Sequence, residues 1–354
     1  IGLAGRGPQA YIVFDLGDDM GASTCVGCGE CVQACPTGAL MPKASLDENG
    51  VYANTPDRKV DSLCPYCGVG CQLTFNIQDD KILSVDGRPG PANRGRLCVK
   101  GRYGFDYVHN PERLTSPLIR KDNCPKTREI SENPLENFRV ASWTEALDFA
   151  ASGLVKVREK DGGNALAGFG SAKGSNEEAY LVQKLVRTGF GTNNVDHCTR
   201  LCHASSVAAL METIGSGAVT APFAEAENAE VIIVIGANPT VNHPVAATFI
   251  KNAVKAGSTL IVMDPRGQAL TRHATHMIQF KPSSDVAMLN GMINTIISEE
   301  LYDQQYIDGY TEGFEDLKKQ TAQFTPERMA PLCGIEANKI KEIARIYANA
   351  NSAL

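Results

Sequence analysis

The spacing of apolar residues changes near residue 142. Beyond that point short apolar runs alternate with longer segments in which apolar residues recur at helical spacing. The pattern predicts strands at residues 165–169, 230–235, 259–264 and 277–280, and helices at residues 177–188, 203–212, 244–256, 285–299 and 337–348. Such alternation is typical of a mostly parallel sheet covered by helices, with ligands at the carboxyl ends of the strands. We therefore predict an α/β domain over residues 142–354.

The chain before residue 142 lacks this alternation. Residues 73–78 and 81–85 alternate apolar and polar positions on either side of Asp79-Asp80, which predicts a β-hairpin. We predict three regions in this part of the chain: a loop-rich module at residues 1–50, a small β-rich module at residues 58–120 and a polar, proline-containing linker at residues 121–141.

Four cysteines give the β-rich module its chemistry. They follow the pattern Cys-x2-Cys-x3-Cys-x26-Cys and are Cys64, Cys67, Cys71 and Cys98. Four thiolates are what a 4Fe-4S cluster needs, and the glycines in the triplet let backbone N–H groups turn toward cluster sulfurs. Zinc sites with four cysteines usually pair two Cys-x2-Cys knuckles instead of a triplet with one remote partner. The spacing favours an iron–sulfur cluster over zinc.

A second cysteine run lies in the first module. Its spacing, Cys-x2-Cys-x2-Cys-x3-Cys-Pro, is that of bacterial ferredoxins, and its members are Cys25, Cys28, Cys31 and Cys35. In two-cluster ferredoxins the fourth cysteine ligates the other cluster. We therefore expect the first three to hold one 4Fe-4S cluster and Cys35 to reach a neighbouring one. No upstream run completes either site, and the chain begins at Ile1 and stops where another strand could start, so we interpret it as a fragment.

Composition narrows the class further. The chain has 354 residues and a net charge of −6, without a basic stripe interleaved with aromatic residues, so nucleic acid is not an expected partner. Its longest aliphatic run, residues 231–235, is too short to span a bilayer. Most of the twelve cysteines have metal-ligand spacing, which predicts a reducing compartment, and we expect the cytoplasm.

Three polar loops follow predicted strands of the α/β domain. The first is rich in glycine and leads to a capping box, Ser175 and Glu178, which suits phosphate but equally suits a plain turn before a capped helix. The next two follow successive strands, and Asp264 is placed for a ribose hydroxyl. Together they favour a nucleotide-bearing ligand over loops that cap their own backbone. The candidate cofactor-binding residues are Gly170, Lys173, Gly174, Asn176, Gly236, Asn238, His243, Asp264, Arg266, Ser283 and Asp285.

With these features placed, the chain resembles the catalytic alpha subunit of molybdenum-dependent formate dehydrogenases of the cytoplasmic, NAD-linked type, in the prokaryotic molybdopterin oxidoreductase family. The resemblance rests on residues 64–71, 96–102 and 191–203 and extends over essentially the whole chain. It implies molybdenum or tungsten held by two molybdopterin guanine dinucleotides. It also implies oxidation of formate to CO2, or the reverse, with electrons passing through the 4Fe-4S clusters to flavin- and iron–sulfur-containing subunits that reduce NAD.

The same resemblance assigns roles to three residues. Cys202 ligates the metal, His203 accepts or orients a proton, and Lys100 bridges the pterin and the cluster of Cys64. By itself a lone thiol before an apolar helix is more often a buried small hydrophobe, and a lone lysine is more often a surface residue. The resemblance gives no ligand role to Cys198, Cys124 and Cys333 and none to His109, His197, His273 and His276.

Two other classes fit part of the pattern. An electron-transfer subunit similar to the large iron–sulfur subunit of respiratory NADH dehydrogenases would keep the cluster motif and a molybdopterin-like scaffold, but it has no need of Cys202-His203. An assimilatory nitrate reductase would keep a metal-bound cysteine, whereas the histidine directly after it favours formate. The family also uses an arginine and a second pterin-binding half beyond Leu354, so we do not expect this chain alone to be a complete enzyme.

Overall fold

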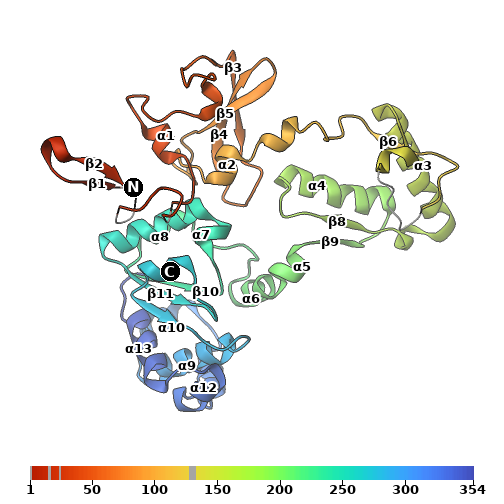
Figure 1. Cartoon of the computed structure of the whole chain (residues 1–354). Helices are drawn as coiled ribbons and strands as arrows, with labels where there is room; N and C mark the ends of the chain where they lie inside the picture. Colours follow the sequence, from red (N-terminus) through yellow and green to blue (C-terminus); the bar gives the residue numbers. More distant parts are fainter. Residues whose placement is uncertain (1, 15–16, 24, 127–132) are drawn as a thin grey trace. The chain divides into compact units, whose positions relative to one another are not determined.

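The computed structural model describes residues 2–14, 17–23, 25–126 and 133–354. The chain divides into two compact units, one formed by Ile1–Arg88 and Leu97–Val219 and the other by Pro89–Arg96 and Thr220–Leu354. Figure 1 shows the elements of both units, coloured along the sequence. Residues 127–132 of the predicted linker lie outside the described residues. Within the described part of the chain, no helix has the length and apolar character needed to cross a membrane.

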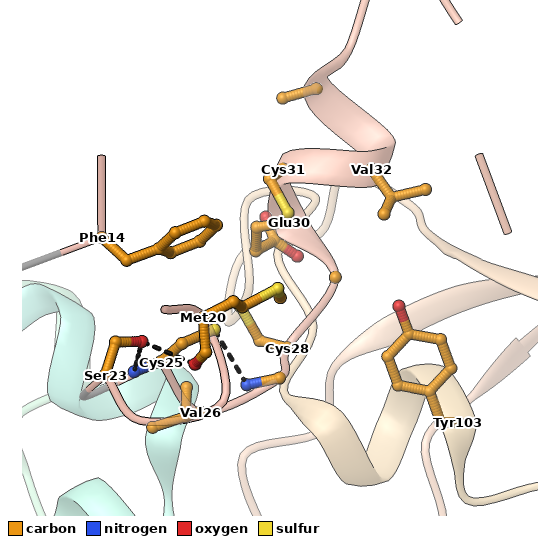
Figure 2. Close-up of a pocket in the computed structure, with 13 residues that line it drawn as sticks. Phe14, Met20, Ser23, Cys25, Val26, Cys28, Glu30, Cys31, Val32 and Tyr103 are labelled. Atoms are coloured by element: carbon orange, nitrogen blue, oxygen red, sulfur yellow. Dashed lines mark hydrogen bonds between the residues drawn. The ribbon is translucent and has the colours of Figure 1, made fainter. Parts of the chain in front are cut away.

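The first unit begins with two short modules built around antiparallel strands. Their elements are β1 (Gly2–Ala4), β2 (Tyr11–Val13), α1 (Glu30–Ala34), β3 (Arg58–Leu63), β4 (Gln72–Gln78), β5 (Lys81–Gly87) and α2 (Val99–Tyr103). The predicted hairpin is confirmed, because β4 pairs antiparallel with β5 around Asp79 and Asp80. Both aspartates have positive φ, 49° and 58°, a conformation that Asp tolerates better than most residues. The loop before α1 and α1 itself line a cavity, drawn in Figure 2.

The rest of the first unit carries the start of the α/β pattern. Its elements are β6 (Leu118–Arg120), β7 (Phe138–Val140), α3 (Trp143–Asp161), β8 (Gly168–Gly170), α4 (Asn176–Lys184), β9 (Val195–His197), α5 (Thr199–Cys202) and α6 (Ala204–Ile214). Strands β8 and β9 are parallel, and β6 and β7 antiparallel. The capping box predicted at Ser175 is present at the start of α4. The helix predicted to reach residue 188 changes at Leu185 into a π-helical segment that ends at Phe190.

The second unit is a three-stranded parallel sheet covered by helices. Its elements are β10 (Val231–Ile235), α7 (Pro239–Asn242), α8 (Pro244–Ala256), β11 (Thr259–Met263), β12 (His276–Ile278), α9 (Asp285–Ser298), α10 (Gln304–Tyr310), α11 (Phe314–Thr321), α12 (Pro326–Cys333) and α13 (Ala337–Ala348). The strand order is β10-β11-β12. Beyond α13, Ala353 forms an isolated parallel bridge with Val231 of β10.

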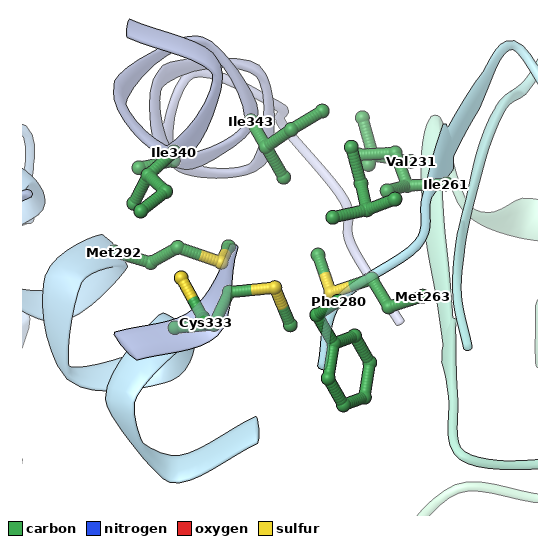
Figure 3. Packing of buried hydrophobic residues seen from close by; sticks show 11 residues of the cluster. Val231, Ile261, Met263, Phe280, Met292, Cys333, Ile340 and Ile343 are labelled. Atoms are coloured by element: carbon green, nitrogen blue, oxygen red, sulfur yellow. The ribbon is translucent and has the colours of Figure 1, made fainter. Parts of the chain in front are cut away.

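The core of the second unit lies on both faces of β11. Ile261 and Met263 pack on one face with residues of α9, α12 and α13 (Figure 3), whereas Leu260 and Val262 pack on the other face with Phe249 of α8. All four strand residues are completely buried. Because successive side chains of a strand point to opposite faces, a strand covered on both sides needs an uninterrupted apolar run, and that run made β11 predictable.

Three details differ from the predicted elements. The strand predicted at residues 165–169 is Gly168–Gly170, because a single 3-10 turn occupies Gly163–Ala165. The strand predicted at residues 277–280 ends at Ile278, although Phe280 is buried in the core, since an apolar residue reports burial whether or not its backbone pairs. The predicted parallel strands also form two separate sheets, β8-β9 in one unit and β10-β11-β12 in the other.

Replacing Leu260 with alanine tests the importance of the two-sided core. Leu260 is completely buried, whereas Leu332 of the same unit is 56% exposed and serves as the matched control. We expect Leu260→Ala to lower the free energy of unfolding by about 2–5 kcal/mol. Leu332→Ala should change it by less than about 0.5 kcal/mol. Urea denaturation followed by circular dichroism measures both, and equal losses in the two variants would contradict the placement of the core.

Candidate functional site

The four cysteines of the β-rich module are brought together by three backbone elements. Cys64 directly follows β3 and Cys71 directly precedes β4, and these two strands pair antiparallel up to Leu63 and Gln72. The Cys64 N–H donates to the Cys71 carbonyl at 2.9 Å, which closes the loop that carries Cys67. Cys98 is the residue immediately before α2. The four cysteines of the motif therefore form one site at the end of a short sheet.

The thiols of this site influence one another electrostatically. Burial, together with the charges of Cys64, Cys67 and Cys98, raises the pKa of Cys71 to about 12. Burial likewise raises the pKa of Cys64, with Cys98 and Cys67 contributing. One buried and three half-buried thiolates are unfavourable so close together without a cationic group among them. The donor set therefore fits an iron–sulfur cluster, which is held by four cysteine thiolates.

Helix α2 places two further residues beside these thiols. The charge of Lys100, like a backbone hydrogen bond from Tyr66, offsets part of the rise in the pKa of Cys64, so this lysine lies within electrostatic reach of the site. Gly101 is buried, and a Cβ atom there would lie 3.4 Å from the Cys64 Sγ. Because Gly101 has no side chain, α2 can lie close to the Cys64 sulfur at this position.

Three of the ferredoxin-type cysteines line a cavity of about 590 Å³. Cys25, Cys28 and Cys31 line it, and the ring of Phe14 lies across from them (Figure 2). Cys35 is not among the residues that line this cavity. A hydrogen bond with the Thr37 hydroxyl, together with backbone groups, lowers the pKa of Cys35 to about 7. Its thiol is thus readily ionised.

No three His, Cys, Asp or Glu side chains among the described residues are gathered closely enough to hold a single metal ion. The cysteines of both motifs are free thiols. The assignment of cluster sites accordingly rests on the spacing, the mutual electrostatic effect of the thiols and the cavity.

Cys202 and His203 lie at the junction of two helices in the first unit. Cys202 is the last residue of the single-turn α5, and His203 separates it from α6 with a non-helical φ of −128°. The Cys202 Sγ lies 3.5 Å from the His203 Nε2, and both residues are exposed. A helix break thus presents a thiol and an imidazole side by side on the surface. Cys198, one turn earlier, contacts His197 instead at 3.7 Å.

The first predicted cofactor loop follows β8. The Lys173 N–H donates to the Ser171 hydroxyl at 3.2 Å, and the Ser175 N–H donates to Glu178 at 2.6 Å, so the loop is ordered by its own side chains. Its candidate residues Lys173, Gly174 and Asn176 are exposed, and Gly170 is half-buried. The structure thus gathers the four candidates of this loop between β8 and the start of α4.

The loops that follow β10 and β11 are joined by a residue that sequence reasoning missed. Gln268 Nε2 donates to the Ala237 carbonyl at 2.8 Å and to Asp264 Oδ2 at 3.2 Å. Asp264 is 92% buried, and its Oδ1 accepts from the Arg266 N–H at 2.9 Å. A glutamine in a turn carries no pattern of its own, so only the fold reveals this connection. Asp264 therefore organises its own loop, and each of its oxygens has a further lone pair for a ligand.

The remaining candidates of the second unit occupy separate positions. Asn238 accepts from the Thr240 hydroxyl at 2.7 Å, and the His243 ring lies 6.2 Å from the Phe223 ring. Ser283 has a φ of +63° just before α9, and Asp285 is the first residue of that helix. They follow β12 as Asp264 follows β11, so the parallel sheet places them at the carboxyl ends of its strands.

Comparison with known families agrees with this organisation. Residues 113–352 match the family described as molybdopterin oxidoreductase, residues 57–110 match its Fe4S4 domain, and residues 22–41 match the 4Fe-4S binding domain. The chain belongs to the molybdopterin oxidoreductase family. The predicted α/β class and the two preceding iron–sulfur modules are confirmed.

Two proteins with similar sequences are formate dehydrogenases. Formate dehydrogenase H of Escherichia coli (strain K12) is 38% identical over 301 residues, which are 84% of this chain and 41% of that protein. The F420-dependent formate dehydrogenase subunit alpha of Methanocaldococcus jannaschii is 37% identical over 295 residues, 83% of this chain and 41% of that protein. The chain thus spans about two-fifths of the length of these relatives.

A solved structure shares the fold. Acetylene Hydratase from Pelobacter acetylenicus matches with a TM-score of 0.71 and 23% sequence identity, over 83% of this chain and 39% of that one. At this identity the likeness concerns the fold alone.

Replacing Cys98 with serine distinguishes the iron–sulfur site from a zinc site. We expect Cys98→Ser to lower the iron content of the purified protein by about four atoms per chain, because a 4Fe-4S cluster needs all four thiolates. Cys124→Ser is the control, since Cys124 belongs to neither cysteine motif and its Sγ lies 3.7 Å from the Asn123 Oδ1. Elemental analysis for iron and zinc gives the answer. Unchanged iron, or loss of zinc instead, would refute the assignment.

Proposed function

We propose that this chain is part of the catalytic subunit of a molybdenum- or tungsten-dependent formate dehydrogenase. The observation that carries the proposal is the exposed Cys202–His203 pair, with thiol and imidazole 3.5 Å apart, on the fold of this family. Two relatives with 37–38% identity are named formate dehydrogenases, which supports formate and CO2 as substrate and product.

The cofactor that we propose is a metal held by two molybdopterin guanine dinucleotides and by the Cys202 thiolate. When bound, it supplies an acceptor for the two electrons of formate. The exposed loop at Lys173 and the loops that Gln268 joins are proposed to bind the dinucleotides. Backbone N–H groups beside the start of α4 suit phosphate, and the buried Asp264 suits a ribose hydroxyl. We propose Gln268 as a further residue of the dinucleotide site, because its hydrogen bonds hold the loops after β10 and β11 together.

His203 is proposed to handle the proton of the reaction. Oxidation of formate yields CO2, two electrons and one proton, and the proton needs an acceptor whether the C–H hydrogen leaves as a hydride or as a proton. An imidazole titrates near neutral pH, so it can take up and release this proton. The 3.5 Å distance between the His203 Nε2 and the Cys202 Sγ supports this role beside the proposed metal ligand.

Electrons are proposed to leave through the two cluster modules. Lys100 lies within electrostatic reach of Cys64 and is proposed to bridge the pterin and this cluster, where its charge favours the reduced cluster. The cluster at Cys25, Cys28 and Cys31 would follow. We propose that flavin- and iron–sulfur-containing partner subunits then reduce NAD in the cytoplasm, where thiols stay reduced until clusters are inserted.

Replacing Cys202 with alanine tests the catalytic assignment. We expect formate-dependent reduction of a viologen dye by the intact protein to fall by about 100-fold or more, because the metal loses its protein ligand. Cys198→Ala, an exposed cysteine one turn earlier, should keep its activity and metal content. Elemental analysis for molybdenum and tungsten accompanies the assay. Iron without either metal, and no formate activity in the unmutated protein, would favour an electron-transfer subunit on the same scaffold, whereas nitrate reduction would favour a nitrate reductase.

The electron acceptor is tested separately in the intact complex. We expect formate-dependent reduction of NAD and no reduction of coenzyme F420, since the motifs resemble the NAD-linked type. The F420-dependent relative makes the comparison necessary. Absorbance at the wavelengths of the two reduced coenzymes measures the rates side by side. Reduction of F420 alone would replace NAD in the proposal and leave the catalytic assignment intact.

A further inference from the structure

A buried arginine joins the two cluster modules of the first unit. The Arg102 side chain, on α2, is only 5% exposed. Its Nε donates to the Cys28 carbonyl at 2.7 Å, and its Nη1 donates to the Val85 carbonyl at 3.2 Å. Its Nη2 donates to Glu30 at 2.6 Å and to Gln33 at 2.7 Å. The guanidinium thus binds the ferredoxin-type module on one side and the β-rich module on the other.

The backbone of the same residue reaches the other cluster site. The Arg102 N–H donates to the Cys98 carbonyl at 3.1 Å. A single residue therefore connects the carbonyl of Cys28, a predicted ligand of one cluster, with the carbonyl of Cys98, a predicted ligand of the other. The connection runs through two hydrogen bonds and the covalent bonds of Arg102.

Two neighbouring side chains strengthen this junction. Glu30, which pairs with Arg102, also accepts the N–H of Leu97 at 2.8 Å, directly before Cys98. Gln33 makes two hydrogen bonds of 2.9 Å with the backbone N–H and carbonyl of Gly87, at the end of β5. Side chains of helix α1 therefore make several hydrogen bonds with the β-rich module around Arg102.

A glycine next to Cys28 leaves space for the Arg102 side chain. Gly29 is buried with a φ of +73°, and a Cβ atom there would lie 2.3 Å from both the Arg102 Cδ and the Tyr103 hydroxyl. No side chain fits at this position. A buried guanidinium is tolerated only when its N–H groups are bonded and its charge is paired, and Arg102 has four hydrogen-bond acceptors including one carboxylate.

We propose that Arg102 is a positioning residue for electron transfer between the two clusters. It fixes the separation of the cluster ligands Cys28 and Cys98 and provides a hydrogen-bonded connection between their carbonyl groups. The step is the transfer of one electron from the reduced cluster of Cys64 to the oxidised cluster of Cys25, with no bond broken and no proton moved. Its place in formate oxidation rests on the proposed function, whereas the coupling of the clusters does not.

The test uses the intact protein reduced with dithionite, so that formate is not needed. In the unmutated protein we expect the two reduced clusters to broaden each other's electron paramagnetic resonance signals. Arg102→Met should keep the iron content, lose most of this interaction and slow the reduction of the Cys25 cluster, followed by rapid freezing, by about tenfold or more. Arg102→Lys, which keeps the charge but cannot reach four acceptors, should give an intermediate spectrum and rate.

Arg58→Met is the matched control, because Arg58 pairs with Asp80 at the surface of the β-rich module with 57% of its side chain exposed. It should behave as the unmutated protein. An unchanged spectrum and rate in fully loaded Arg102→Met would overturn the proposal. If Arg102→Met loses iron, the same criterion applies to Arg102→Lys: an unchanged spectrum and rate in that variant would overturn the proposal. Loss of iron from both, with the Arg58 control loaded, would also overturn it, since Arg102 would then serve cluster retention. Absence of formate activity with altered cluster coupling would instead count against the proposed function alone.

Discussion

The gathering of four thiols in a half-buried space is the constraint on which the amino-terminal half of this chain depends. Burial and mutual repulsion raise the pKa of Cys71 to about 12, so the site opposes the charged state that a cluster requires of its ligands. Rigid backbone holds the thiols together nonetheless: the hydrogen bond from Cys64 to Cys71 closes one side, and α2 fixes Cys98 on the other. The sheet and the short helix are thus best understood as a support for this site.

Much of the fold could be predicted because burial imposes simple patterns. Helix α8 occupies the predicted residues 244–256, and β10 and β11 lie within one residue of their predicted ends. Both strands contribute to the two clusters of buried side chains on the two faces of their sheet, and α8 contributes to one of them, so the apolar positions of these elements are unambiguous. The two iron–sulfur modules could also be recognised from the sequence, because the spacing of the cysteine ligands is set by the geometry of a cluster and depends little on the surrounding chain.

Other parts could not be predicted, for physical reasons that particular residues illustrate. Helix α3 has no buried residue among its 19, and Trp143, Leu147 and Phe149 are more than 60% exposed, so its apolar positions do not mark a buried face. Gln268 and Arg102 act through contacts with residues distant in sequence, and a single glutamine or arginine has no periodicity to reveal them. The division of the parallel strands into two sheets likewise depends on pairing, which is invisible in the apolar runs themselves.

Helix α2 shows how a very short element can serve two sites at once. Residues two apart on a helix point in directions separated by about 200°, so Lys100 and Arg102 cannot share a face. The charge of Lys100 acts on Cys64, whereas Arg102 binds the carbonyl of Cys28 in the other module. Gly101 between them leaves room for the Cys64 sulfur. A cation is thereby supplied toward each cluster motif from opposite faces of one helix. Because that helix begins at Cys98, any shift of it would alter both sites together, which makes this segment the natural point of coupling between the modules.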